Sequence, residues 1–153
     1  GDVNRNIADT GEKVVVCGAG VSGIECAGAL GKAGKDVTLV DMIPVSAMGS
    51  TMQPFLFMTY FLQIFPEHQV TLEGECQIQS FDEKGVTVKT TQGEKHIDAD
   101  TIVNALGVKP NKTLTESIMK KYPVNSHFIG DCTSVGGTLR KANAEAYAVA
   151  VKI

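Results

Sequence analysis

The sequence predicts an α/β fold in which a parallel sheet carries an inserted antiparallel β-meander. A β-branched run at residues 14–17 meets a glycine-rich turn and a helical pattern, and a second apolar run follows at residues 36–40. This order of strand, helix and strand within about 30 residues is typical of parallel sheets. Farther along, short alternating segments between residues 76 and 97 are separated by tight-turn residues, as in antiparallel hairpins.

The first three elements follow from apolar spacing and from the residues that end each segment. Residues 14–17 predict a buried strand, and residues 21–34 place their apolar side chains on one face of a helix. Gly34 stands where a helix commonly ends. Residues 36–40 then predict a second buried strand, with Asp41 at its carboxyl end.

The later elements are predicted from turns and prolines. Residues 53–65 lie between prolines and predict a helix, and a short strand is expected at residues 70–72. The meander strands are expected at residues 76–81, 85–91 and 94–97. The remaining elements are a buried strand at 100–106, a helix at 111–121, a strand at 127–129 and an alanine-rich helix at 139–151.

Composition and charge are those of an ordinary globular protein. The 153 residues are 43% hydrophobic and 20% charged, with a formal net charge of −3, which excludes disorder as the main state. No run rich in Lys and Arg is present, so the charge pattern needed for nucleic acid is missing. The most apolar window, residues 55–65, is far shorter than the roughly 20 residues that cross a bilayer. We therefore expect no nucleic acid and no membrane as partners.

The four cysteines carry no CxxC pair. The apolar settings of Cys17 and Cys26 favour free buried thiols, so we expect a reducing, cytoplasmic compartment. The histidines and cysteines lack metal-ligand spacing, and no metal site is expected. The chain begins at Gly1 without a signal-peptide pattern, and we expect it to be a fragment of a longer protein.

A glycine-rich motif follows the first predicted strand. It matches GxGxxG and consists of Gly18, Ala19, Gly20, Val21, Ser22 and Gly23. The first glycine permits a tight turn, the second lets the backbone approach a pyrophosphate, and the third lets the helix pack close to the strand. The helix N-terminus would then face the anion. The alternative is a helix-packing turn that binds no ligand.

Asp41 suits the adenosine ribose of a dinucleotide. It stands 18 residues after Gly23, at the end of the second strand, where a carboxylate can accept hydrogen bonds from ribose hydroxyls. A 2′-phosphate would face like charge there, and no Arg or Lys occurs between Lys35 and Lys84. NAD(H) is therefore favoured over NADP(H). The alternative is that Asp41 is only a solvated strand end.

Three ordered motifs resemble a known family. Residues 18–42, GAGVSGIECAGALGKAGKDVTLVDM, are similar to the NAD(P)H-binding motif of two-dinucleotide-domain flavoprotein reductases, which are pyridine nucleotide-disulfide oxidoreductase-like. Residues 100–111 and the Phe-Ile-Gly-Asp-Cys of residues 128–132 resemble later motifs of that family. Within it, the pattern looks most like the dienoyl-CoA reductase, enoate reductase and trimethylamine dehydrogenase group, and the resemblance covers residues 12–153.

The resemblance implies roles for individual residues. The glycine motif would cradle the NAD pyrophosphate, Asp41 would bind the adenosine ribose, and Glu25 would lie near the nicotinamide. Gly107 would let the backbone approach the cofactor, and Asp131 corresponds to an FAD ribityl contact. The amino-terminal GxGxxG of the FAD domain and the redox-active cysteine pair are both missing from these residues. No catalytic residue is assigned.

The predicted function follows from this resemblance. Residues 1–127 would form an NAD(H)-binding domain, and residues 128–153 a strand and helix of the FAD-domain type. The domain would present the nicotinamide to a flavin held by the flavin-binding portion of the parent protein, with FAD as the parent's cofactor. The isolated chain is expected to be inactive, and either to self-associate, with a homodimer favoured, or to have a mobile carboxyl terminus. The alternative is a non-catalytic nucleotide-binding or redox-sensing module.

Overall fold

The computed structural model describes residues 6–152, and these divide into two compact units between Gly107 and Val108. The sequence places a domain boundary after residue 127 instead. The compact units divide at residue 107, while the boundary after residue 127 and the FAD-domain character of residues 128–153 stay predictions.

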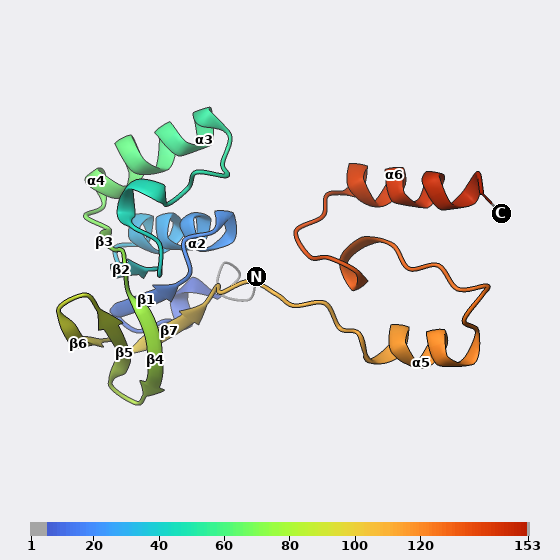
Figure 1. Cartoon of the computed structure of the whole chain (residues 1–153). Coiled ribbons are helices and arrows are strands. Elements are labelled where there is room, and N and C mark those ends of the chain that lie inside the picture. Colours follow the sequence, from blue (N-terminus) through green and yellow to red (C-terminus); the bar gives the residue numbers. More distant parts are fainter. Residues whose placement is uncertain (1–5, 153) are drawn as a thin grey trace. The chain divides into compact units, whose positions relative to one another are not determined.

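The first unit is built on a parallel sheet (Figure 1). Its strands are β1 (Lys13–Cys17), β2 (Asp36–Val40), β3 (Thr71–Glu73) and β7 (Thr101–Asn104). Their order is β3-β2-β1-β7, and each neighbouring pair is parallel. Helix α2 (Val21–Lys32) connects β1 to β2. The predicted α/β class and its strand, helix, strand unit are therefore confirmed.

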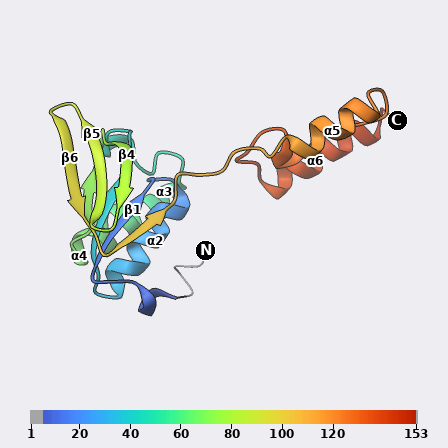
Figure 2. The ribbon, with the colours of Figure 1, turned by 90° about the horizontal axis from the view of Figure 1, so that it is seen from below.

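An antiparallel sheet forms the second layer of strands (Figure 2). It contains β4 (Gln77–Asp82), β5 (Gly85–Thr90) and β6 (Gly93–Asp98) in consecutive order. This confirms the inserted meander. The short strand predicted just before the meander corresponds to β3, which pairs with β2 in the parallel sheet.

Strand β1 is buried on both faces, which explains its uninterrupted apolar sequence. Val14 and Val16 pack in one core cluster with residues of α2, including Ile24 and Leu30. Successive side chains of a strand point to opposite faces. Val15 and Cys17 accordingly lie in a second cluster, whose other members are Val40, Cys76, Val86, Val88 and Ala99. The meander therefore covers the sheet face opposite α2.

A continuous helical segment follows the loop after β2. It consists of α3 (Pro54–Phe57), the π-helix η3 (Met58–Ile64) and α4 (Phe65–Glu67). The expectation that the prolines bound the helix at residues 53 and 65 is wrong at its carboxyl end, because Pro66 lies inside the helix. Pro66 stands in the first turn of α4, where its missing N–H breaks no α-helical hydrogen bond.

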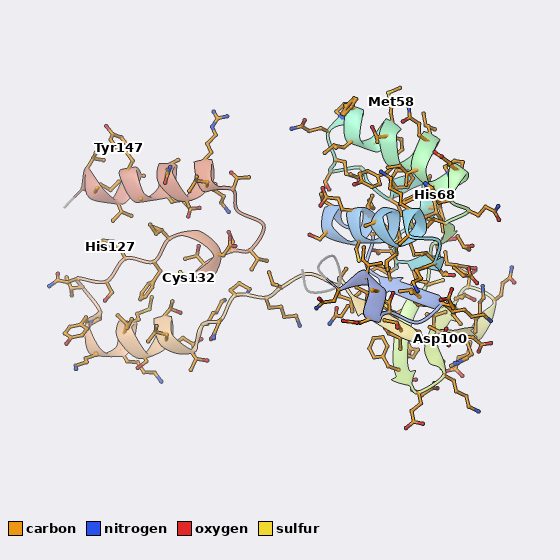
Figure 3. The ribbon with its side chains drawn as sticks, turned by 180° about the vertical axis from the view of Figure 1, so that it is seen from behind. Met58, His68, Asp100, His127, Cys132 and Tyr147 are labelled. Atoms are coloured by element: carbon orange, nitrogen blue, oxygen red, sulfur yellow. The ribbon has the colours of Figure 1, made fainter. Side chains whose placement is uncertain are left out.

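The helical segment packs against glycines of α2. An added β-carbon on Gly28 would lie 2.6 Å from Cε1 of Tyr60, and one on Gly31 would lie 3.2 Å from Cβ of His68. His68 directly follows α4, and Figure 3 shows that Met58 of η3 points away from α2. The two glycines therefore let the helices approach closely.

The second unit contains α5 (Thr113–Lys121), the short 3-10 helix η4 (Gly130–Cys132) and α6 (Leu139–Ala150). The predicted strand at residues 127–129 is wrong. Ile129 has an extended backbone, with φ −138° and ψ 161°, but no strand pairs with it among residues 6–152. An extended segment becomes a strand only where a partner takes up its N–H and C=O groups.

Candidate dinucleotide-binding site

The turn between β1 and α2 is held between the carboxyl ends of three strands. The N–H of Gly18 donates to the carbonyl of Val40 at the end of β2, 2.8 Å away. The N–H of Ala105, just after β7, donates to the carbonyl of Cys17 at 2.8 Å. Gly18 has φ +109°, and a β-carbon on it would collide with the carbonyl oxygen of Ala105. Only glycine fits there.

The other two glycines of the motif differ from each other. A β-carbon on Gly23 would collide with the carbonyl oxygen of Gly18, so this glycine lets α2 start directly beside the turn. Gly20 has no heavy atom within 4 Å of its β-carbon position, and its φ of −71° suits any residue. The fold does not require glycine at this position. Its missing side chain instead leaves open space in front of the turn.

The N-terminus of α2 carries no side-chain cap. Gly20 is its N-cap, and the N–H of Ile24 is bonded to the carbonyl of Gly20 at 3.0 Å. No acidic residue lies in the first turn. The N–H groups of a first helical turn lack intrahelical partners and concentrate partial positive charge. The open space at Gly20 thus lies beside a helix end suited to an anion.

Asp41 joins the glycine-rich turn to the loop that follows β2. The N–H of Ala19 donates to Oδ2 of Asp41 at 2.5 Å, and the N–H of Ile43 donates to Oδ1 at 3.2 Å. Each carboxylate oxygen has two acceptor lone pairs, so both can still accept a hydroxyl. The partly exposed carboxylate is therefore free to bind ribose while it holds the turn.

A cavity of about 460 Å³ opens at this edge of the sheet. Its lining residues are Gly18, Gly20, Asp41, Met42, Cys76, Gln77, Ile78, Ala105, Leu106 and Gly107. Four of these were predicted from sequence, and the structure brings all four together. Residues 76–78 were missed because they start the meander, far along the chain from the motif. Met42 directly follows Asp41, and Leu106 directly precedes Gly107. This position beside a predicted residue was the only signal in the sequence that could have found them.

The remaining predicted residues lie elsewhere. Ala19, Val21, Ser22 and Gly23 form the turn and the start of α2. Glu25 is exposed on α2 and does not line the cavity. Asp131 belongs to the second unit, where its Oδ1 accepts a hydrogen bond from the N–H of Gly137 at 3.2 Å. It lines a separate cavity of about 290 Å³ between η4 and the start of α6.

The thiols of the first unit are protected from ionisation. Burial raises the pKa of Cys17 to about 11, and burial also raises the pKa values of Cys26 and Cys76. The four cysteines are free. Within residues 6–152, no three His, Cys, Asp or Glu side chains gather to hold a metal ion. No helix in that range has the length and apolarity to cross a membrane.

The parallel sheet and the glycine-rich turn between β1 and α2 define a Rossmann-like α/β domain. Comparison with protein families then identifies the family, because the model described as pyridine nucleotide-disulphide oxidoreductase matches residues 2–146. The chain belongs to this family. The resemblance in the sequence motifs is thereby confirmed at the family level, and the narrower group stays a prediction.

Curated relatives are longer oxidoreductases. The chain is 29% identical over 140 residues to the bilirubin reductase of Mediterraneibacter gnavus, covering 90% of this chain and 21% of that protein. It is 29% identical over 143 residues to the nitric oxide reductase FlRd-NAD(+) reductase of Pectobacterium atrosepticum, covering 84% of this chain and 37% of that protein. The chain thus spans well under half of these relatives.

A solved structure of 2-naphthoyl-CoA reductase in complex with 2-naphthoyl-CoA matches this fold with a TM-score of 0.75 and 25% identity. The match covers 99% of this chain and 23% of that one. The shared fold therefore extends over both units of the chain, while most of the larger enzyme has no counterpart here.

Proposed function

We propose that this chain is the NAD(H)-binding domain of a flavin-dependent oxidoreductase, and that it presents the nicotinamide to a flavin held by the rest of the parent protein. One observation carries the proposal. The glycine turn is open at Gly20, beside the uncapped N-terminus of α2, and it faces the cavity that Asp41 lines. Membership of the pyridine nucleotide-disulphide oxidoreductase family supports the same role.

The residues of this site fit a dinucleotide. The pyrophosphate would lie in the open space at Gly20, where the first N–H groups of α2 can bind its oxygens. Asp41 would accept hydrogen bonds from the adenosine ribose. Met42 and Ile78 supply apolar wall to the same cavity, suited to an adenine ring. Bound NADH supplies a hydride, and this chain's residues contribute binding and orientation.

NAD(H) is the preferred form of the cofactor in this proposal. The carboxylate of Asp41 would repel a 2′-phosphate. Among the residues that line the cavity, neither Lys nor Arg is present to neutralise that phosphate. Discrimination of about 1.4 kcal/mol already corresponds to a tenfold difference in affinity.

The flavin would be held mainly outside these residues. The sequence contains a single GxGxxG motif, which the proposal assigns to NAD(H). Asp131 and its small cavity supply at most one edge of an FAD site. The chain spans 21% to 37% of the two curated relatives above, which leaves room in a longer parent for a flavin domain. Membership of the dienoyl-CoA reductase group is part of this proposal.

The test is calorimetric titration of the 153-residue chain with NADH and NADPH, together with an absorption spectrum. We expect NADH to bind at least about tenfold more tightly than NADPH. We also expect a colourless preparation that does not oxidise NADH with artificial acceptors. Asp36→Asn removes a carboxylate at the opposite end of β2 and serves as a control for the loss of one negative charge away from the cavity. Absence of NADH binding would overturn the proposal. If the chain binds NADH but its absorption spectrum is that of a flavin, the chain itself holds the flavin, and the assignment of the flavin to the rest of the parent protein is overturned.

The alternative function is a nucleotide-binding or redox-sensing module without catalysis. Measurements on the full-length parent protein distinguish this module from the oxidoreductase. NADH-dependent reduction of a flavin in the full-length parent supports the oxidoreductase, and a parent that binds NADH but holds no flavin supports the module.

A further inference from the structure

We propose that Asp41 has a second role as a positioning residue: its carboxylate holds the glycine-rich turn in its binding conformation before a dinucleotide arrives. This inference rests on the proposed function, because it concerns the same site. It goes beyond ribose recognition, since it assigns Asp41 a task that is independent of any ribose hydroxyl.

The two carboxylate oxygens hold two separate backbone segments. Oδ2 accepts the N–H of Ala19 at 2.5 Å, across 22 residues of sequence. Oδ1 accepts the N–H of Ile43 at 3.2 Å, which fixes the orientation of the carboxylate. A carboxylate that only awaited a ligand would point both oxygens to solvent. Here each oxygen is already engaged with the backbone.

The turn depends on this contact because of its own sequence. Ala19 lies between two glycines, and glycine has the greatest backbone freedom of any residue. Ala19 is only 3% exposed, so its N–H has little access to water. A buried N–H without a partner is unfavourable, and the carboxylate of Asp41 is the partner that satisfies it here. Loss of this bond would therefore release the centre of the turn.

Asp41 is itself held in place by its backbone. Its N–H donates to the carbonyl of Glu73 at 3.0 Å, and its carbonyl accepts the N–H of Cys76 at 2.9 Å. Cys76 lines the same cavity. A continuous set of hydrogen bonds thus connects the cavity wall to Asp41 and Asp41 to the turn. The consequence is that the wall and the pyrophosphate site keep one relative position.

This role makes a prediction that ribose recognition alone does not make. If Asp41 acted only on ribose hydroxyls, its replacement would not affect a ligand that lacks them. If it also holds the turn, replacement weakens binding of a dinucleotide even when that dinucleotide has no hydroxyl for Asp41 to bind. In NADPH binding, the same loss would offset the gain from removing the charge that repels the 2′-phosphate.

The experiment combines two variants with two ligands. Wild type, Asp41→Asn and Asp41→Ala are titrated with NADH and with an NADH analogue whose adenosine ribose is 2′,3′-dideoxy. We expect Asp41→Ala to weaken binding of the analogue by about tenfold, because both backbone contacts of the carboxylate are lost, including the one that holds the turn. Asp41→Asn keeps one acceptor oxygen and should restore part of that loss. Equal affinity of wild type and both variants for the analogue would overturn the inference.

A second measurement needs no ligand. Amide hydrogen exchange at Ala19 should accelerate by about tenfold or more in Asp41→Ala, which leaves its N–H without an acceptor, while Val16 in β1 keeps its wild-type rate. Asp36→Asn should leave both rates unchanged. Unchanged exchange at Ala19 would overturn the inference even if NADH binds. Failure of wild type to bind NADH would instead overturn the proposed function, and the exchange result would still decide the role of Asp41 in the turn.

Discussion

The α-carbon of Gly23 lies so close to the carbonyl oxygen of Gly18 that no β-carbon fits between them. Gly20, which stands between these two residues in the motif, has open space at the same position. The glycines of one motif therefore serve two purposes. Gly18 and Gly23 are required by the fold, and Gly20 keeps a surface clear for a ligand.

The first prediction separates these purposes. Gly20→Ala should change the free energy of unfolding by less than about 1 kcal/mol, because its backbone conformation suits alanine and nothing lies nearby. It should nevertheless weaken NADH binding by about tenfold or more, since the new methyl group occupies the pyrophosphate space. Urea unfolding and calorimetric titration measure the two quantities.

Gly23→Ala is the matched comparison. It should destabilise the fold by about 3 kcal/mol or more, because its methyl group meets backbone that cannot move aside. If Gly20→Ala proved as destabilising as Gly23→Ala, the open space at Gly20 would not be reserved for a ligand.

The second prediction concerns the contact between α2 and the π-helix. Gly28→Ala should lower the free energy of unfolding by about 1 to 3 kcal/mol, because its β-carbon would lie 2.6 Å from the Tyr60 ring. Adding Tyr60→Ala should remove part of this extra cost, so the two changes are not additive. Lys32→Ala, exposed on the last turn of α2, is the control. Strict additivity in urea unfolding would argue against a shared contact.

The third prediction is a pH dependence from Cys17. Burial raises its pKa from an ordinary value of 9.0 to about 11 in the folded protein. Between these values the unfolded chain releases the proton and the folded chain keeps it, so stability falls as pH rises. Below pH 9 the contribution is fully present. Wild type should lose on the order of 1 to 3 kcal/mol more than Cys17→Ala between pH 8 and pH 11.

Val15→Ala controls for the loss of core volume in the same strand. It removes buried atoms of β1 without removing a thiol and should keep the wild-type pH dependence. Unfolding free energies at several pH values give the comparison. A Cys17→Ala variant with the wild-type slope would show that this thiol does not control alkaline stability.

The fourth prediction concerns the second unit. No side chain of residues 108–152 is buried, and α6 leaves Leu139 and Tyr147 79% and 72% exposed. Exposed apolar faces of this kind tend to be covered by another copy or to remain mobile. We expect self-association in solution, with a dimer as the main species, or rapid amide exchange over residues 128–152. Sedimentation and hydrogen exchange test this. A monomer at high concentration with protected amides in α6 would contradict it.

The sequence by itself determined the local unit from β1 to Asp41. A β-branched run, three spaced glycines and a helical apolar period act on neighbouring residues, so no distant part of the chain is needed to predict β1, α2 and β2. The bounds of β2, Asp36–Val40, agree with the prediction residue for residue. Gly18, Gly20 and Asp41 line the cavity for the same reason, because a parallel strand order places the carboxyl ends of β1 and β2 together.

Tertiary structure alone decided the rest of the site. Residues 76–78, 105 and 106 reach the cavity only because β3 pairs with β2 and β7 pairs with β1, whereas Gly107 was expected there from the family resemblance. The helical segment continues beyond the π-helix through Pro66 in α4, and its Tyr60 packs on Gly28, a contact that no local pattern reveals. Residues 127–129 have strand-like sequence but no partner strand within residues 6–152. Local patterns act through the chain's own neighbours, whereas strand pairing and helix packing depend on surfaces that only the folded chain brings together.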